Sequence, residues 1–233
     1  MDTKIEKNTI AEDVEAVVTS FNQGEMLLEA VRSLQRQTTP PAKIIVVDDG
    51  STDKDSVHIL RRLESDFDAP VPVVVIRQPN RGVSGARNAG IRKARTPFVL
   101  VLDGDDSLEP SYIEQVSRLL REHPSMIAAS SWMRTFGVLN ATICPEGGNI
   151  AAFCVRNCCP ATHIFRRELW ERCGCSDGKL KYFMQWTQIR RWEKRQIILS
   201  GIRRMATAEW RLRSGSRRSA MPEMNINAKY MII

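Results

Sequence analysis

Short apolar runs alternate with longer amphipathic stretches through the first half of the chain. Runs rich in β-branched residues predict strands at residues 14–20, 43–48, 71–77 and 98–103. The spacing of apolar positions predicts helices at residues 25–37, 56–65, 85–94, 110–123 and 166–174. Strand segments such as IIVV and VVVI have no polar side, so both faces of their sheet must be covered. The pattern therefore predicts an α/β fold: a mostly parallel sheet with helices on both faces.

The regular pattern fades toward the end of the chain. We expect one domain at residues 1–176 and an irregular basic segment at 177–233, because neither strand nor helix periodicity is sustained there. The charge changes at the same place. Residues 1–176 hold 21 Lys and Arg against 23 Asp and Glu, whereas residues 177–233 hold 13 against 4.

Three interpretations of this basic tail stay open. It is a poorly packed segment from a displaced reading frame or a truncated gene, a divergent acceptor-binding segment, or a functional basic anchor. The first follows from the abrupt loss of pattern. The last follows from the attraction of cationic segments to anionic lipid, which leaves peripheral contact with a membrane open.

Composition excludes several classes of protein. Hydrophobic residues make up 42% and charged residues 26%, as in ordinary globular chains. No apolar run approaches the ~18 residues that suggest a membrane span, and the N-terminal residues lack the apolar stretch of a signal peptide. We therefore expect a cytoplasmic protein, with any membrane contact at the inner face. Because the positive charge is confined to the tail, we expect no nucleic-acid partner.

Six cysteines lie between Cys144 and Cys175. Their spacings do not match the paired C-x(2–4)-C arrangement of structural zinc sites. In a cytoplasmic protein, reduced thiols commonly serve as small core residues. We expect that role here and predict no metal site from these cysteines.

Polar side chains follow three of the predicted strands. The first ends in Thr19-Ser20-Phe21-Asn22, the second in Asp48-Asp49-Gly50-Ser51-Thr52-Asp53, and the fourth in Asp103-Gly104-Asp105-Asp106. Ligands of open parallel sheets bind beyond the carboxyl ends of the strands. So many carboxylates at neighbouring strand ends would repel one another without a compensating cation.

The D-G-D-D segment suits a hard divalent cation. Asp103 and Asp105 can offer carboxylates to Mg²⁺ or Mn²⁺, which proteins often hold together with substrate phosphates. This chemistry fits a nucleoside diphosphate. Two simpler interpretations stay open, because the same residue types form turns and helix caps. In these, residues 103–106 are a turn before a helix, and Asp53 or Ser56 caps the helix after the second strand.

Four segments occur together in an order that is typical of one family. They are VVTSFNQGEMLLEAVRSLQRQ, KIIVVDDGSTD, NRGVSGARNAGI and FVLVLDGDDSLEP. Together they resemble the family 2 nucleotide-sugar glycosyltransferases, with weaker similarity through FRRELWERCG. The resemblance implies a GT-A fold, which is a Rossmann-like, mostly parallel sheet with helices on both faces.

The resemblance also implies roles for individual residues. Asp48 and Asp49 would meet the base and ribose, with a carboxylate accepting from a uracil N–H. Asp103 and Asp105 would form the D-x-D motif that binds Mn²⁺ or Mg²⁺. The implied donor-binding residues are Thr19, Ser20, Asn22, Asp48, Asp49, Arg81, Arg87 and Asp103.

The implied activity is metal-dependent, inverting transfer of a sugar from a nucleotide-diphosphate sugar, with UDP favoured, to an acceptor hydroxyl. The acceptor would be a saccharide or a lipid-linked molecule. Similar enzymes use an Asp as the catalytic base, and in the best-matching segment here, Tyr182–Thr187, Gln185 takes its place. An amide does not accept a proton as a carboxylate does. The alternative is therefore an impaired or truncated relative that only binds a nucleotide sugar or a partner.

Overall fold

The computed structural model describes most of residues 10–173 and one short segment near the C-terminus. The described residues are 10–65, 70–126, 128–136, 140–143, 161–173 and 229–232. Every structural statement below concerns these residues.

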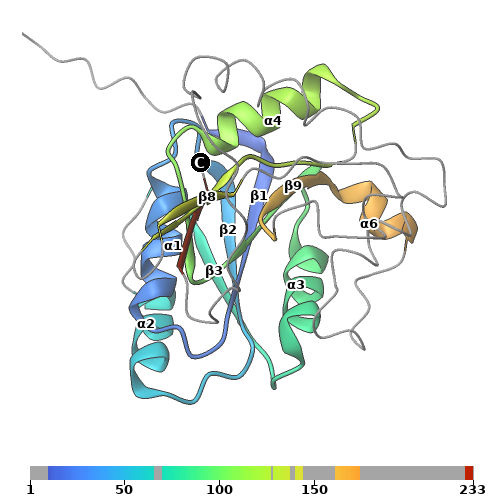
Figure 1. Ribbon diagram of the computed structural model, residues 1–233. Helices are drawn as coiled ribbons and strands as arrows, with labels where there is room; N and C mark the ends of the chain where they lie inside the picture. Colours follow the sequence, from blue (N-terminus) through green and yellow to red (C-terminus); the bar gives the residue numbers. More distant parts are fainter. Residues whose placement is uncertain are drawn as a thin grey trace, which may run out of the picture.

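A six-stranded sheet forms the centre of the molecule (Figure 1). Its strands, in spatial order, are β3 (Val73–Arg77), β2 (Pro41–Asp48), β1 (Ala11–Ser20), β4 (Phe98–Asp103), β9 (His163–Arg166) and β6 (Ala128–Ala129). The first four are parallel, β9 runs antiparallel to β4, and β6 runs antiparallel to β9. This confirms the predicted α/β fold with a mostly parallel sheet.

Helices cover both faces of this sheet (Figure 1). The helices are α1 (Glu25–Gln35), α2 (Lys54–Ser65), α3 (Gly82–Lys93), α4 (Tyr112–Glu122) and α6 (Arg167–Cys173). Apolar side chains of α1, α2 and α4 form one core with Val14, Ala16 and Val18 of β1. The other core lies around Val17, between the sheet and helices α3 and α6. The two faces follow from the alternation of side chains along the strand.

Helix α3 packs against the sheet so that no room is left for a Cβ atom at Gly90. A Cβ atom at Gly90 would lie 2.3 Å from Cγ1 of Val17 and 3.1 Å from Cγ2 of Val47. Any larger residue would push the helix away from β1 and β2. Gly90 therefore fixes the distance between α3 and the sheet.

A second sheet has four short strands. Its order is β5 (Asp106–Leu108), β10 (Lys229–Ile232), β7 (Met133–Phe136) and β8 (Ala141–Ile143). Strand β10 pairs in parallel with β5 and antiparallel with β7. The sequence pattern predicted no element at residues 229–232. The rest of the segment 177–233 lies outside the described residues.

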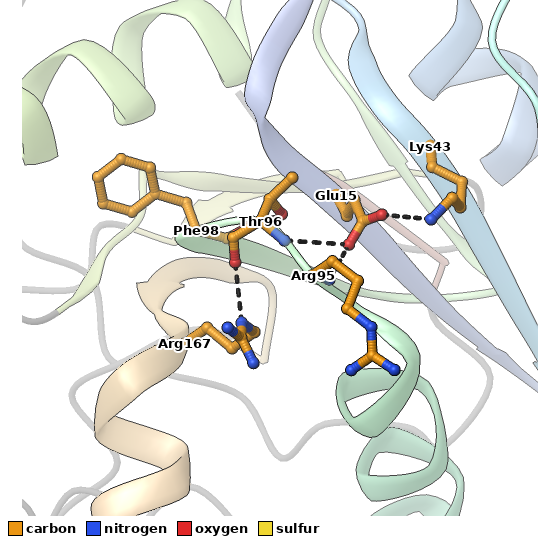
Figure 2. Close-up of polar contacts among 6 residues, drawn as sticks. All are labelled: Glu15, Lys43, Arg95, Thr96, Phe98 and Arg167. Atoms are coloured by element: carbon orange, nitrogen blue, oxygen red, sulfur yellow. Dashed lines mark hydrogen bonds and ion pairs between the residues drawn. The ribbon is translucent and has the colours of Figure 1, made fainter.

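A buried carboxylate joins β1 to the turn between α3 and β4 (Figure 2). Glu15 is 3% exposed, and its Oε1 accepts a hydrogen bond from Lys43 Nζ at 2.5 Å. Its Oε2 accepts from the backbone N–H groups of Arg95 and Thr96. Burial alone would raise the pKa of Glu15, yet these hydrogen bonds outweigh burial and hold the pKa below its ordinary value. The charge is therefore compensated inside the fold.

Candidate active site

The candidate site lies where β1, β2 and β4 end together. In the parallel register Thr19 is opposite Asp103, and Ser20 is opposite Asp48. A hollow of about 230 Å³ opens at this edge, and its lining residues are Thr19, Ser20, Phe21, Gln23, Val83, Asp103 and Asp105. Sites for drug-sized ligands typically enclose roughly 300–1,000 Å³. The hollow is therefore smaller than a typical site for a whole drug-sized ligand.

Asp103 is held by two side chains from other elements. Thr19 Oγ1 donates to Asp103 Oδ1 at 3.2 Å, and the guanidinium of Arg87 on α3 contacts the same oxygen at 2.5 Å. Arg87 is 7% exposed, and its Nε is buried without a hydrogen-bond partner among the described atoms. These contacts fix the orientation of the carboxylate of Asp103 at the wall of the hollow.

Asp105 shares the hollow with Asp103 but lacks its compensation. Burial raises the pKa of Asp105, the nearby charge of Asp103 raises it further, and Arg87 lowers it only in part. Two carboxylates that line one hollow are a suitable oxygen donor set for a hard divalent cation. Within the described ranges no cluster of three or more His, Cys, Asp or Glu residues is placed to hold a metal ion. A cation here would thus complete its coordination with other oxygens.

The turn between the two carboxylates requires a glycine. Gly104 donates its N–H to the carbonyl oxygen of Thr19 at 2.9 Å. A Cβ atom at Gly104 would lie 2.9 Å from that oxygen and 2.3 Å from Oε1 of Gln23. The Gln23 oxygen is also buried without a hydrogen-bond partner in the described part of the chain. The close approach of β1 and the D-G-D turn brings Asp103 and Asp105 to one hollow.

Asp48 and Asp49 shape the loops beside the hollow. Both are 4% exposed. Asp48 Oδ1 accepts from the backbone N–H of Ser51 at 3.0 Å. Asp49 Oδ1 accepts from Gln78 Nε2 at 2.6 Å and from the backbone N–H of Arg81 at 2.9 Å. The loop after β2 is thereby joined to the N-terminus of α3.

Asn22 has a role that its sequence position did not indicate. Its backbone lies in the left-handed region with φ 52°, and its Oδ1 accepts from the backbone N–H groups of Thr52 and Asp53 at 2.8 and 3.3 Å. Asn22 does not line the hollow. Its side chain joins the loop after β1 to the loop after β2.

Asp53 in turn accepts from the backbone N–H of Ser56 at 2.8 Å at the start of α2, as the helix-cap interpretation predicted.

The structure brings together some predicted residues and adds others. Thr19, Ser20, Asp103 and Asp105 line one hollow, and Arg87 contacts Asp103. The side chain of Arg81 is exposed at the start of α3 and does not line it. The lining residues that sequence analysis missed are Phe21, Gln23 and Val83. Their only signal was position, directly after β1 and at the start of α3.

Two neighbouring residues at the hollow, Ser20 and Phe21, differ in exposure. Ser20 is 3% exposed, and its Oγ has no hydrogen-bond partner among the residues that the structure describes. The ring of Phe21 is 46% exposed. Gln185 and its segment Tyr182–Thr187 lie outside the described residues, so the predicted base position is not placed.

Among the helices that are described, none has the length and apolar content to cross a membrane.

Comparison with known proteins gives consistent matches. Residues 15–172 match the family model described as glycosyl transferase family 2. The glycosyltransferase YwdF of Bacillus subtilis, described as uncharacterized, is 25% identical over 182 residues, covering 74% of this chain and 65% of YwdF. The succinoglycan biosynthesis protein ExoO of Rhizobium meliloti is 33% identical over 104 residues, covering 45% of this chain and 28% of ExoO. The chain thus spans less than two thirds of either relative.

Solved structures with low sequence identity share the fold. S. aureus TarS 1–349 in complex with UDP-GlcNAc matches with a TM-score of 0.63 and 19% identity, over 77% of this chain and 52% of that chain. The mannosyltransferase PcManGT of Pyrobaculum calidifontis in complex with GDP-Man and Mn²⁺ matches with a TM-score of 0.55 and 20% identity. That match covers 76% of this chain and 52% of PcManGT.

Proposed function

This chain belongs to glycosyl transferase family 2, and from that premise we propose that it transfers a sugar from a nucleotide-diphosphate sugar to an acceptor hydroxyl. The observation that carries the proposal is the pair Asp103 and Asp105 at one hollow, with Asp103 held by Thr19 and Arg87. This hollow lies at the carboxyl ends of the parallel strands, where open α/β sheets bind their ligands.

The donor is proposed to be a UDP-sugar. The exposed ring of Phe21 offers a flat apolar surface for a base, and the buried Oγ of Ser20 lacks a partner that a ligand hydroxyl or N–H would supply. Asp48 and Asp49 each use one carboxylate oxygen to hold a loop. Their remaining oxygens are the proposed acceptors for a uracil N–H and for ribose. TarS and PcManGT, crystallised with UDP-GlcNAc and GDP-Man, support a nucleotide-sugar donor.

A divalent cation, Mn²⁺ or Mg²⁺, is proposed to bind at Asp103 and Asp105. The residues fit such an ion, because both carboxylates line the hollow and the raised pKa of Asp105 indicates a site short of positive charge. When bound, such a cation stabilises the negative charge of a leaving diphosphate. Arg87 supplies part of the same compensation from the protein and holds Asp103 in position.

Transfer is proposed to invert the anomeric centre. The acceptor hydroxyl gives its proton to a base while its oxygen attacks the anomeric carbon of the donor sugar. The bond from that carbon to the nucleoside diphosphate breaks, and the diphosphate leaves on the opposite side. The proposed acceptor is a saccharide or a lipid-linked molecule, and the basic tail is the proposed element for contact with a membrane. Gln185 stands at the base position, so transfer by this chain is expected to be slow. The alternative that follows is a protein that binds the donor without transfer.

Calorimetry with UDP tests donor binding. We expect UDP to bind with Mn²⁺ present, and to bind at least about 10-fold more weakly after chelation or in Asp105→Ala, because a charge-assisted contact is worth roughly 1.5–3 kcal/mol. Glu122→Ala is the matched control, since Glu122 is an exposed acid on α4 that does not line the hollow. Equal affinity in all four samples would refute the cation site.

Turnover separates transfer from binding alone. Loss of a positioned base typically lowers a rate by about 10²- to 10⁴-fold. We therefore expect slow donor consumption by this chain and faster consumption by Gln185→Asp. A rate of about 1 per second or more in the unmodified chain, within the usual range of enzymes, would show that another group serves as the base.

A further inference from the structure

Helix α3 carries a site residue but has a poor helix sequence. Its twelve residues, GVSGARNAGIRK, include Gly82, Gly85 and Gly90, and Arg81 at its N-cap makes no side-chain capping hydrogen bond. Glycine is among the least favourable residues inside a helix. The position of α3 must therefore be fixed by contacts with neighbouring elements rather than by the helix alone.

The rotation of α3 decides where Arg87 points. The side chain of Arg87 is 8% exposed, and its guanidinium reaches Asp103 Oδ1 at 2.5 Å. A small turn of the helix about its axis would carry the guanidinium away from that oxygen. Asp103 would then keep Thr19 Oγ1, at 3.2 Å, as its other side-chain contact described above.

Helix α6 contacts α3 at the residue next to Arg87. The indole Nε1–H of Trp170 donates to Oδ1 of Asn88 at 3.1 Å. Both residues are 7% exposed, so water does not readily replace this bond. The ring of Trp170 also belongs to the core that contains Ala86 and Ile91 of α3.

A second contact joins α6 to the turn that follows α3 (Figure 2). Arg167 donates from its Nε to the carbonyl oxygen of Thr96 at 3.0 Å, and from its backbone N–H to the carbonyl oxygen of Pro97 at 2.8 Å. Glu15 holds the same turn from β1 through the N–H groups of Arg95 and Thr96. Helix α6 thus contacts α3 beside Arg87 and also the turn beyond the end of α3. These contacts act together with the packing of Ala86 and Ile91 in the same core to position α3.

We propose that Trp170 is a positioning residue for the site: its N–H bond to Asn88 fixes the rotation of α3 and so keeps Arg87 paired with Asp103. The pairing exists in the ligand-free protein. Its effect on a nucleotide and cation rests on the proposed function. Trp170 lies outside the hollow, so it acts through α3 and not by contact with a ligand.

Side-chain NMR of the ligand-free full chain tests the pairing directly. The readout is rotation of the Arg87 guanidinium about its Nε–Cζ bond, with the signal assigned through Arg87→Lys. In Trp170→Phe, which keeps an aromatic ring but removes the N–H, we expect this rotation to become several times faster. Leu169→Ala is the control, because Leu169 is a buried neighbour on α6 in the same core. It should lower the melting temperature without speeding the rotation. Unchanged rotation in Trp170→Phe would overturn the proposal.

A double-mutant cycle on UDP binding with Mn²⁺ gives a second test. Trp170→Phe and Asn88→Ala should each weaken binding by about 2- to 10-fold, as expected for loss of one hydrogen bond. The loss in the double variant should be smaller than the sum of the two single losses, since both changes remove the bond between Trp170 and Asn88. Additive losses would overturn the coupling. If the unmodified chain does not bind UDP, the proposed function fails, while the NMR measurement still decides the role of Trp170. Asn88→Ala replaces Trp170→Phe in that measurement if the latter does not fold.

Discussion

Two partly or fully buried carboxylates in the same domain have opposite electrostatic environments. Glu15, within β1, accepts hydrogen bonds from Lys43 and from two backbone N–H groups, and its pKa is lowered. Asp105, just after β4, is raised in pKa by burial and by the charge of Asp103. The fold supplies the counter-charge for the first carboxylate but only part of it for the second.

This difference separates a structural role from a ligand-binding role. A carboxylate with positive or N–H partners stabilises the folded state when it is ionised. A buried carboxylate without enough such partners destabilises the folded state until a cation or cationic ligand binds beside it. Residues of the same chemical type therefore differ in what their removal does. Substitutions at four positions test or refine this comparison, and they are taken from the largest expected effect to the smallest.

Glu15→Ala should produce the largest loss of stability. It leaves the backbone N–H groups of Arg95 and Thr96 without their acceptor, and each buried unsatisfied donor costs about 1–3 kcal/mol. We expect the free energy of unfolding to fall by roughly 2–4 kcal/mol in urea titrations. Glu12→Ala, an exposed acid on the same strand, is the control and should change little. An equal loss of stability in Glu15→Ala and Glu12→Ala would show that the hydrogen bonds of Glu15 do not stabilise the fold.

The stabilisation by Glu15 should depend on pH in a defined direction. Because its pKa is lower in the folded state, its contribution is complete above the ordinary glutamate pKa of about 4.3. It is lost as the pH falls through the lower, folded value. The difference in unfolding free energy between the unmodified chain and Glu15→Gln should therefore shrink on acidification below about pH 4. A constant difference would contradict the assignment.

Gly104→Ala should deform the turn that carries Asp103 and Asp105 while leaving the contacts of Glu15 unchanged. The new methyl group would lie 2.9 Å from the carbonyl oxygen of Thr19, which is backbone and cannot move aside as a side chain can. Overpacking of this kind typically costs about 1–3 kcal/mol. We expect weaker UDP binding with Mn²⁺ in calorimetry together with the loss of stability. Gly82→Ala is a comparison at a glycine whose Cβ would meet no atom of the described residues within 4 Å, although its φ of 76° adds strain of its own.

Asp105→Asn should have the opposite sign from Glu15→Gln. The raised pKa means that ionised Asp105 destabilises the folded state, an effect that is absent below the ordinary aspartate pKa of about 3.9 and grows as the pH rises toward the folded value. At neutral pH we expect the melting temperature of Asp105→Asn to rise by about 1–3 °C. Measured without divalent ions, a lower melting temperature would show that Asp105 is compensated after all.

Arg77→Ala should have the smallest effect and sets the baseline for charge removal. Arg77 forms a two-bond ion pair with Glu64, and both side chains are about 40% exposed. Exposed pairs are worth about 0.2–1 kcal/mol and are screened by salt. We expect a loss within that range in urea titrations, decreasing in high salt. A loss as large as that of Glu15→Ala would mean that burial does not distinguish the two pairs.

The sequence predicted the four parallel strands of the central sheet because their signal is local, but it did not predict β9 and β6 of the same sheet. Apolar runs such as Ile44–Val47 and Val99–Leu102 are buried strands, and the residues after them lie at the strand ends as expected. The short strands β7, β8 and β10 were not predicted. They have too few residues for a period to be seen, and partners distant in the sequence hold them.

The candidate site was predicted in part for a similar reason. Asp103 and Asp105 follow directly from a strand and a D-x-D spacing. The role of Asn22 in joining two loops could not be predicted, because its partners Thr52 and Asp53 belong to another loop. Glu15 reads as an interruption in an apolar strand until Arg95 and Thr96 are brought beside it. The participation of Phe21, Gln23 and Val83 depends on how close the loops come in three dimensions.

The position of β4 between β1 and β9 has a consequence for protein synthesis. Strands β1 to β4 can assemble as soon as residues up to Asp103 have left the ribosome, but β9 begins only at His163. At the usual ~5–20 residues per second, the apolar edge of β4 stays open for a period on the order of seconds. An unpaired strand edge is a template for association between chains. Nascent chains arrested before β9 should therefore aggregate more readily than chains arrested after α6.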